Sequence, residues 1–338
     1  MMNIKEKQTQ QVLLSFEEQL IGAKQFILNH NDFLVVSHMN PDGDAASSTM
    51  AMGWMLKQLN KRFTLINEDI IPNKFNYLWG NEDILSLETD SPSSTYCFII
   101  CVDCADFSRI GKVSSLFNEN VQILNIDHHP TNDYFGDYNL ICEYAAATTE
   151  ILYDLANKLK IQWSKELGTC IYTGLLTDSG GFRYANTTPK VMNIASHMLD
   201  IGVDGHDLAD RLLEKISVSH LFVLQKALLT LSFSHDQQIC WISVTAEDIS
   251  SANASKEDLE GIVNYPHNIE GVEVGILFKE TEPQQFKISL RSSGKVNVAA
   301  IAQLFGGGGH VRAAGCSLTG SLDQVTEWIV KEVGFALG

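Results

Sequence analysis

The sequence predicts an α/β protein with two lobes. A mostly parallel sheet with helices on both faces is followed by a smaller C-terminal α/β domain. The length points to two lobes, because 338 residues exceed what one compact core usually holds. Short apolar runs alternate with helical segments over residues 1–200, which is typical of a parallel sheet. Near Gly202 the pattern changes, and strand-like runs follow.

The elements of the first lobe follow from their residue patterns. Apolar residues from Leu13 onward recur at helical spacing and predict an amphipathic helix over residues 13–27. Apolar runs bounded by polar residues predict buried strands over residues 33–36, 63–66, 96–102 and 121–126. Further helices are expected over residues 45–59, 144–159 and 165–176, the first of them after the turn Pro41-Asp42-Gly43-Asp44.

The second lobe is predicted in the same way. Residues 207–231 indicate one or two helices that connect the lobes, and strands are expected over residues 239–244, 272–278 and 286–290. A helix over residues 298–305 leads directly into four glycines and His310, and a closing helix is expected over residues 323–333. We therefore predict a first domain over residues 1–200, a helical linker over 201–225 and a second domain over 226–338.

Composition restricts the class of protein. The polar start and the absence of a long apolar run indicate a cytoplasmic protein that is not a membrane protein. Seven cysteines without a disulfide-framework spacing indicate reduced thiols. The net charge of −17 argues against binding to long duplex nucleic acid, which depends on phosphate neutralisation. A small phosphate ester remains compatible if metals and local cations offset the repulsion.

Metal-capable side chains follow several of the predicted strands. The tripeptide Asp127-His128-His129 ends one apolar run, and similar groups follow or flank other segments: His38, Asp42, Asp44, Asp103 and Asp178. Each motif alone also fits a solvated turn or a strand cap. Because ligands collect at the carboxyl ends of strands in open α/β sheets, their joint placement predicts one metal site.

So many carboxylates in one place would repel each other unless cations were bound. Oxygen and imidazole ligands suit Mn²⁺, with Mg²⁺ or Co²⁺ as substitutes. We therefore expect two divalent ions that share a bridging carboxylate and activate a hydroxide for attack on phosphorus.

The glycine run of the second lobe is a second candidate site. Gly306 is suited to end the preceding helix, whereas Gly307, Gly308 and Gly309 would expose backbone N–H groups to an anion. Arg291 and His310 would add charge-assisted donors for a phosphate. A flexible linker is the alternative interpretation of four glycines.

Together these motifs resemble the DHH phosphoesterases. Ser37-His38-Met39-Asn40-Pro41-Asp42-Gly43-Asp44-Ala45, Val102-Asp103, Asp127-His128-His129 and Thr177-Asp178-Ser179-Gly180 are similar to the ordered motifs of that family. The segment from Gly306 to His310, with Ala313-Ala314-Gly315, resembles the signature of the associated DHHA1 domain. Over nearly the whole chain the sequence is similar to the nanoRNase A subfamily. The resemblance implies hydrolysis of short oligoribonucleotides to mononucleotides and removal of the 3′-phosphate from 3′-phosphoadenosine 5′-phosphate.

The resemblance also implies a role for each residue. His38, Asp42 and Asp103 would hold one metal, and the other would be held by Asp44, Asp103, His128 and Asp178. As the bridging ligand, Asp103 would be catalytic, and so would His129, as phosphate contact or general acid. Asp127 would orient a histidine from behind. Arg291, the glycine run and His310 would hold the substrate, and Arg109 is a further phosphate candidate whose alternative is a surface salt bridge.

Several other functions stay open. A cyclic-di-AMP or linear dinucleotide phosphodiesterase would use the same site. A RecJ-like single-strand exonuclease shares the motifs, although more positive charge and further nucleic-acid-binding modules would be expected. The glycine–histidine segment argues against a family II pyrophosphatase. A non-catalytic nucleotide-binding protein is the alternative from a different class. The expected partners are short single-stranded RNA and nucleoside bisphosphates, and a homodimer is left open.

Overall fold

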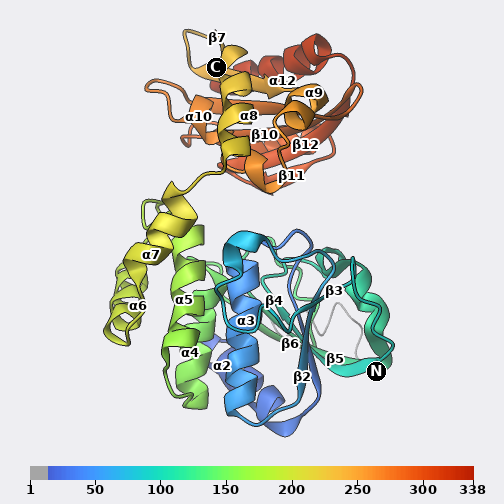
Figure 1. Cartoon of the computed structure of the whole chain (residues 1–338), viewed down its shortest axis with the longest axis vertical. Helices are drawn as coiled ribbons and strands as arrows, with labels where there is room; N and C mark the ends of the chain where they lie inside the picture. The colour runs from blue at the N-terminus through green and yellow to red at the C-terminus, as the bar shows by residue number, and fades with distance from the viewer. Residues whose placement is uncertain (1–13) are drawn as a thin grey trace. The chain divides into compact units, whose positions relative to one another are not determined.

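The computed structural model describes residues 14–338, and the chain divides into two compact units between Lys215 and Ile216. Figure 1 labels the elements of both. The N-terminal unit contains α2 (Phe16–Asn29), β1 (Phe33–Val36), α3 (Gly43–Gln58), β2 (Phe63–Asn67), η1 (Asn73–Phe75), β3 (Leu85–Ser86), β4 (Tyr96–Val102), η2 (Phe107–Leu116), β5 (Phe117–Asp127), β6 (Tyr138–Ile141), α4 (Thr148–Leu159), α5 (Lys165–Asp178), α6 (Pro189–Asp200), α7 (Gly205–Ala209) and η3 (Asp210–Glu214).

The N-terminal sheet is entirely parallel. Its strand order is β3-β2-β1-β4-β5-β6. The chain first adds strands on one side of β1 and then returns to add β4, β5 and β6 on the other side. The order therefore reverses between β1 and β4, and such a switch point opens a crevice at the carboxyl ends of the strands.

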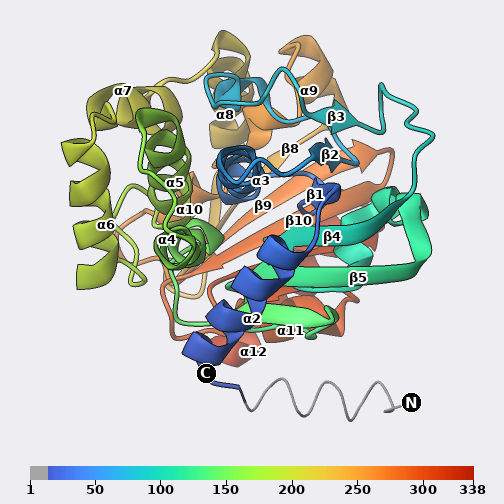
Figure 2. The ribbon, with the colours of Figure 1, turned by 90° about the horizontal axis from the view of Figure 1, so that it is seen from below.

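Both faces of this sheet are covered, which explains why its strands are continuous apolar runs. Phe33 and Val35 of β1 pack into the core under α2, α3, α4 and α5, whereas Leu34 and Val36 pack into the core on the opposite face. That second core includes Ile110 and other apolar residues of η2, a 3-10 segment. Figures 1 and 2 show α2 to α5 gathered on one face of the sheet.

The C-terminal unit has a mixed sheet. Its elements are α8 (Val218–Leu229), β7 (Ser232–Ser234), β8 (Ile239–Val244), α9 (Ala246–Ser251), η4 (Glu257–Leu259), α10 (Asn264–His267), β9 (Val274–Glu282), β10 (Gln285–Ser292), α11 (Val298–Leu304), β11 (Gly308–His310), β12 (Ala313–Thr319) and α12 (Leu322–Leu337). The strand order is β11-β12-β10-β9-β8-β7, and only β8 and β9 pair in parallel. One face packs on α11 and α12, and the other packs on α8.

The predicted fold class is confirmed, with differences in detail. The strands expected over residues 33–36 and 96–102 have those bounds, and α2 begins at Phe16 because Ser15 and Glu18 form a capping box. Leu13, the predicted first residue of that helix, lies outside the described residues. The pattern analysis did not identify α6, β6 or β12. Within residues 14–338, no helix is long and apolar enough to cross a membrane.

Candidate active site

The predicted metal-capable residues of the N-terminal unit lie together at the switch point of its sheet. His38 and Asp42 follow β1, and Asp103 follows β4, the adjacent strand. Asp127 ends β5, so its neighbours His128 and His129 leave the same edge. Asp44, near the start of α3, and Asp178, at the end of α5, complete the set.

The first group consists of His38, Asp42 and Asp103. Nε2 of His38 lies 3.4 Å from Oδ2 of Asp103 and 3.9 Å from Oδ1 of Asp42. Nδ1 of His38 bonds to the carbonyl oxygen of Met39 at 2.8 Å, which fixes the ring and directs Nε2 toward the carboxylates. Asp42 is the exposed member, with 59% of its side chain accessible. This group is therefore open to solvent on one side.

The second group consists of Asp44, His128 and Asp178. Nε2 of His128 lies 3.4 Å from Oδ2 of Asp178, and Nδ1 lies 3.3 Å from the carbonyl oxygen of Ala145. One ligand atom from each group member lies within 4.8 Å of the others. These three residues come from α3, the end of β5 and α5, so the tertiary fold assembles the group.

Asp103 faces both groups. Its Oδ2 is directed toward His38, whereas its Oδ1 lies 3.6 Å from Nε2 of His128. The residue has φ +58°, a left-handed conformation that is uncommon for a non-glycine residue. Its backbone N–H donates to the carbonyl oxygen of Ile126 on the neighbouring strand at 2.9 Å, which helps hold this conformation. The two oxygens of the Asp103 carboxylate thus face different groups, one toward His38 and the other toward His128.

The carboxylates strongly perturb one another. Burial and the nearby charge of Asp103 raise the pKa of Asp44 to about 7. Burial, with the charges of Asp44 and Asp42, raises the pKa of Asp178 well above its usual range. Burial alone would raise the pKa of Asp103 too, but the hydrogen bond and charge of His38 and the charges of His128 and His129 hold it well below its ordinary value.

The donor set fits divalent cations. Across residues 14–338, the ion pairs made by Asp42, Asp103, Asp127 and Asp178 go to histidines and none goes to lysine or arginine. A cluster of buried carboxylates without a fixed cation is unfavourable, and bound metal ions remove the repulsion. Carboxylate oxygens and imidazole nitrogens suit Mn²⁺ and related ions. The residues present are therefore consistent with a metal centre.

His129, which forms a third metal-capable group with Asp103 and His128, is held by a chain of hydrogen bonds. Its Nδ1 lies 2.7 Å from Oδ1 of the fully buried Asp127. The other oxygen of Asp127 accepts from Nδ2 of Asn132 at 2.7 Å. Burial lowers the pKa of His129, but the hydrogen bond that Nδ1 donates to Asp127 and the charge of Asp103 outweigh it and raise the pKa to about 9. Asn132 was not identified from the sequence, although it lies only five residues after Asp127, because the turn between them is what brings its amide to the carboxylate.

Thr148 and Thr149 are two further residues that the sequence analysis missed. The backbone N–H groups of both donate to Asp44, at 2.6 and 3.1 Å, so this aspartate caps α4 from another element. Their hydroxyls donate to Asp103 at 3.0 Å and to Asp44 at 2.9 Å. The helix predicted from residue 144 therefore begins later, at Thr148, where the carboxylate satisfies its N-terminal donors. Local residue patterns do not show a cap supplied from another part of the chain.

Arg109 lies close enough to influence the site. The pKa values of His38 and His129 are both raised overall, by their neighbouring aspartates, and the positive charge of Arg109 opposes that rise at each histidine. Its carbonyl oxygen accepts from the backbone N–H of Met39 at 2.8 Å, which ties η2 to the segment after β1. The charge of Arg109 is thus felt at two histidines of the metal-capable cluster.

Arg291 and His310 share one row of the C-terminal sheet. Arg291 of β10 lies opposite Ala313 of β12, and His310 of β11 lies opposite the same Ala313. Directly opposed residues point to the same face of a sheet. Leu290 and Ala314, the preceding and following neighbours in this register, belong to the core under α11 and α12. Arg291 and His310 therefore project from the opposite face of the sheet, and strand β12 lies between their two strands.

The glycine run is only partly a loop. Gly306 has φ +73°, and the N–H groups of Gly306 and Gly307 donate to Gln303 and Ala302, so the predicted helix cap is a Schellman motif. Gly308–His310 form the edge strand β11. A Cβ at Gly307 would lie 2.1 Å from the carbonyl oxygen of Gly315, whereas one at Gly308 would meet nothing within 4 Å. Close packing on β12 accounts for part of the glycine requirement.

A buried carboxylate organises the segment after Arg291. Oε1 of Glu273 accepts from the hydroxyl of Ser292 and from the backbone N–H groups of Gly294, Lys295 and Val296, at 2.7–3.2 Å. The guanidinium of Arg312 lies against Gly294, where a Cβ would be 2.9 Å from Nη2. Glu273 and Arg312 were not predicted as part of this region. The small and polar residues that follow Arg291 in the sequence were the feature that could have indicated such an organised segment.

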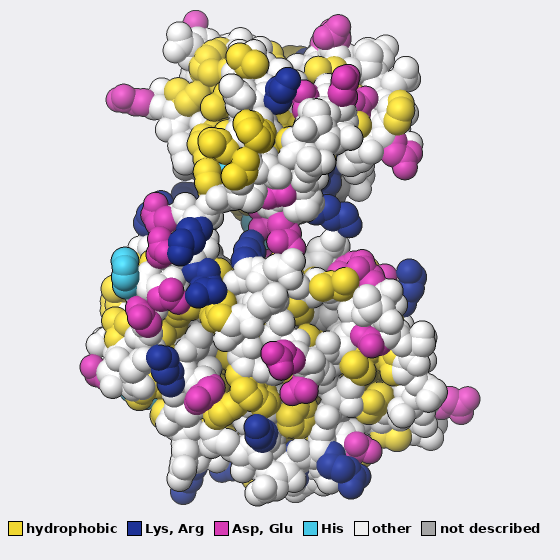
Figure 3. All heavy atoms as spheres, viewed as in Figure 1, with side chains coloured by type: hydrophobic (Ala, Val, Ile, Leu, Met, Phe, Trp, Pro, Cys, Tyr) yellow, Lys and Arg dark blue, Asp and Glu magenta, His cyan; other side chains and the backbone are white. Residues whose placement is uncertain are grey.

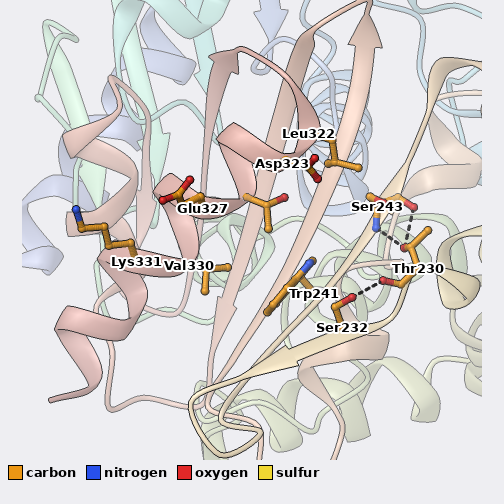
Figure 4. A pocket seen from close by; sticks show the side chains of 10 residues that line it. Thr230, Ser232, Trp241, Ser243, Leu322, Asp323, Glu327, Val330 and Lys331 are labelled. Carbon is orange, nitrogen blue, oxygen red and sulfur yellow. Dashed lines mark hydrogen bonds between the residues drawn. The ribbon is translucent and has the colours of Figure 1, made fainter.

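A separate groove in the C-terminal unit has a different chemistry (Figure 4). Its volume is about 650 Å³, and it lies between α12 and the β7–β8 edge. The lining includes Trp241, several hydroxyls, the carboxylates of Asp323 and Glu327, and one cation, Lys331. Two carboxylates against one ammonium do not favour a phosphate. The row of Arg291 and His310 is the better anion candidate.

Comparison with known families agrees with this division. Residues 32–175 match the DHH family, N-terminal domain. Residues 238–333 match the DHHA1 domain. Every metal-capable residue named above except Asp178 lies within the match to the DHH family.

Individual relatives cover most of the chain. A bifunctional oligoribonuclease and PAP phosphatase NrnA of Thermus thermophilus is 34% identical over 302 residues, which is 88% of each chain. The protein of the same description in Bacillus subtilis is 23% identical and covers 86% of this chain and 90% of its own. The crystal structure of an exopolyphosphatase-related protein from Bacteroides fragilis is similar with a TM-score of 0.88 and 26% identity, over 95% of this chain and 98% of that one.

Proposed function

The chain belongs to the DHH family and carries a C-terminal DHHA1 domain, and from this membership we propose that it is a metal-dependent phosphoesterase for short oligoribonucleotides and nucleoside bisphosphates. The observation that carries the proposal is the convergence of His38, Asp42, Asp44, Asp103, His128 and Asp178 at one sheet edge. Relatives named as oligoribonuclease and PAP phosphatase support the substrate class.

Two divalent ions, with Mn²⁺ as our choice and Mg²⁺ or Co²⁺ as substitutes, fit the two groups. His38, Asp42 and Asp103 would hold one, and Asp44, Asp103, His128 and Asp178 would hold the other. The direction of the two Asp103 oxygens toward His38 and His128 supports a bridging role. Such ions would lower the pKa of a bound water and stabilise the charge that develops on the phosphoryl oxygens.

His129 is our candidate for the group that contacts the scissile phosphate and its leaving ribose oxygen. Asp127 holds Nδ1, so the ring orientation is fixed and Nε2 is the atom assigned to the substrate. A proton donated from Nε2 to the leaving ribose oxygen would complete hydrolysis of the P–O bond. Arg109 is suited to bind a nonbridging phosphate oxygen nearby, since its charge already acts on His38 and His129.

The C-terminal unit is proposed to hold a terminal phosphate or nucleotide. Residues 283–322 contain no Asp or Glu, although the whole chain has 41, and they include Lys287, Arg291, Lys295 and Arg312. Arg291 and His310 project from the same face of the sheet within this segment. Gly307, Gly308 and Gly309 let the backbone approach a ligand closely. A locally positive segment in an acidic protein favours a small phosphate ester over a long strand.

The substrate class is tested by comparing three compounds. A short 5′-labelled RNA, 3′-phosphoadenosine 5′-phosphate and a cyclic dinucleotide are incubated with the protein, with Mn²⁺ and with a chelator. We expect mononucleotides from the RNA and loss of the 3′-phosphate from the bisphosphate, both only with metal. Preferential cleavage of the cyclic dinucleotide would instead assign the protein to cyclic-dinucleotide turnover, and binding without turnover would contradict the enzymatic proposal.

A further inference from the structure

Helix α8 has apolar residues on two opposite faces. Val223, Leu224 and Ala227 are buried in the core that α8 forms with β8 and β9. On the other side a row of large apolar side chains is exposed, between 42% and 81% of each, with Gln225 in its middle. We name this row the exposed α8 face: Val218, Leu221, Phe222, Gln225, Leu228 and Leu229. Figure 3 shows hydrophobic side chains gathered over the position that α8 has in Figure 1.

The spacing of these residues makes a continuous stripe. Positions three, four and seven residues apart lie on one side of a helix, and the exposed α8 face follows that pattern over three turns. Ile216, Leu231 and Phe233 are also exposed and extend the apolar character at both ends. Single exposed apolar residues are ordinary, but a contiguous patch marks a surface that binds something.

We propose that the exposed α8 face binds the same face of a second copy of this chain. The first argument is charge. Each copy carries a net charge of −17, so two copies repel each other over most of their surfaces. Residues 215–235 contain no Asp or Glu. Removing carboxylates from water is the costly step when acidic surfaces associate. Two copies can meet at residues 215–235 without that step.

The second argument is the position of Gln225. It is the polar member of the exposed α8 face and lies between Leu221 and Phe222 on one side and Leu228 and Leu229 on the other. A glutamine amide both donates and accepts hydrogen bonds. In an antiparallel pair of α8 helices related by a twofold axis, Gln225 faces Gln225 of the other copy, and the apolar pairs face each other on both sides. Such a face is complementary to itself, as a twofold interface requires.

The charges at the margins agree with an antiparallel arrangement. Lys226, the charged residue of α8, lies in its C-terminal half. Asp258 lies at the N-terminal end of the helix, where it accepts a hydrogen bond from Ser217. An antiparallel pair therefore brings the Lys226 end of each helix toward the Asp258 end of the other. A parallel pair would place like charges together.

The oligomeric state of the full-length chain tests this inference. Multi-angle light scattering over a dilution series should give twice the chain mass, decreasing on dilution. The double variant Leu221→Glu/Leu229→Glu should have the single-chain mass at the same concentrations and an unchanged circular dichroism spectrum, because both side chains are exposed. Leu304→Glu is the control, since Leu304 is 67% exposed on α11 and lies outside the stripe. A single-chain mass for the unchanged protein, or a dimer that survives the double variant, overturns the inference.

A cross-link distinguishes a second copy from other occupants. Gln225→Cys is made together with Cys97→Ser, because Cys97 is the exposed native cysteine among the described residues. Oxidation should give a disulfide-linked dimer, whereas Gln303→Cys, an exposed position on α11, should not. If Gln225→Cys remains uncross-linked while α8 is protected from hydrogen exchange in a monomer, another part of the same chain covers the stripe and the inference is wrong. The result is independent of hydrolytic activity, so it does not depend on the proposed function.

Discussion

The two candidate sites of this chain are built in opposite ways. The N-terminal site gathers acidic and imidazole side chains from α3, α5 and the ends of β1, β4 and β5, residues far apart in the sequence. The C-terminal site comes mainly from one continuous segment, residues 283–322, that carries cations and no carboxylate. The charges of the first candidate site therefore favour cations, and those of the second favour anions.

This difference shows what each site requires of the fold. Buried carboxylates such as Asp44 and Asp103 depend on donors from distant elements, for example Thr148, so the whole N-terminal unit must be folded before the site exists. The Arg291 row depends on a local hairpin and its neighbouring strand. We therefore expect substitutions in the first site to act on metal binding and turnover, and substitutions in the second to act on substrate binding and local stability.

The largest effect is expected for Asp103→Ala. The substitution removes the carboxylate that faces both metal-capable groups. Loss of several kcal/mol of transition-state stabilisation corresponds to a decrease of about 10³-fold or more in kcat. Asp83→Ala, at an exposed aspartate outside the site, is the control. Turnover of a diribonucleotide and metal content by mass spectrometry are measured, and a fully active Asp103→Ala protein would refute the assigned site.

The residues that the sequence singled out as metal ligands lie together for a physical reason. His38, Asp103 and Asp127 directly follow or end buried parallel strands, and strand ends meet at one sheet edge whatever the details of packing. The supporting residues Thr148, Thr149 and Asn132 were missed because their partners are distant in the sequence or lie across a turn. The bonds of Thr148 and Thr149 depend on tertiary structure, and that of Asn132 depends on the shape of one turn, so none of them leaves a recognisable residue pattern.

In the C-terminal unit the sequence predicted a local helix cap but missed a strand. Gly306 was predicted as a helix cap, and its φ of +73° confirms that prediction. The strand β11 was not predicted, because glycine has low strand propensity and its neighbours gave no alternating pattern. Only the pairing with β12 explains why residues 308–310 are extended.

Two glycine substitutions separate packing from ligand binding in this hairpin. Gly309 has φ +141°, and a Cβ there would lie 2.5 Å from the carbonyl oxygen of Ala313, so Gly309→Ala should lower the free energy of unfolding by about 2–3 kcal/mol. Gly308→Ala is the matched control, since its Cβ would meet nothing within 4 Å, and should change it by less than about 0.5 kcal/mol. Chemical denaturation measures both. Weakened substrate binding in a fully stable Gly308→Ala protein would show that the glycine backbone contacts the ligand.

Arg291→Ala should weaken substrate binding more than turnover. A charge-assisted bond to phosphate contributes about 1.5–3 kcal/mol, so KM should rise roughly 10- to 100-fold with a smaller change in kcat. Lys287→Ala is the matched control, because Lys287 lies on the same strand and face, four residues away, and is exposed. An equal effect of both substitutions would mean that general charge, and not the Arg291 row, is responsible.

Thr148→Val should have a moderate effect on metal affinity. The substitution keeps the shape of the side chain but removes the hydroxyl that donates to Asp103 at 3.0 Å. Loss of a residue that orients a metal ligand typically costs about 10- to 100-fold in metal affinity or activity, and we expect the lower end because the backbone N–H of Thr148 still holds Asp44. Titration of activity with Mn²⁺ should show a higher half-saturating concentration and recovery in excess metal. Thr148→Ser, which keeps the hydroxyl, should behave like the unchanged protein.

Glu273→Gln should have the smallest effect, and its pH dependence identifies the cause. Burial opposes ionisation of Glu273, but hydrogen bonds from Lys295, Ser292, Val296 and Gly294 outweigh it and lower its pKa below the ordinary value of 4.5. A lowered pKa means that the folded state favours the carboxylate. The resulting stability is therefore complete above pH 4.5 and is lost as the pH falls through the folded-state pKa.

The unchanged protein should exceed Glu273→Gln by about 1 kcal/mol in unfolding free energy near neutral pH. That difference should be constant between pH 6 and 8 and should shrink below about pH 4.5 in denaturation experiments. A difference that persists unchanged into the acid range would show that Glu273 acts through its shape and neutral hydrogen bonding, and that the segment after Arg291 does not depend on a buried charge.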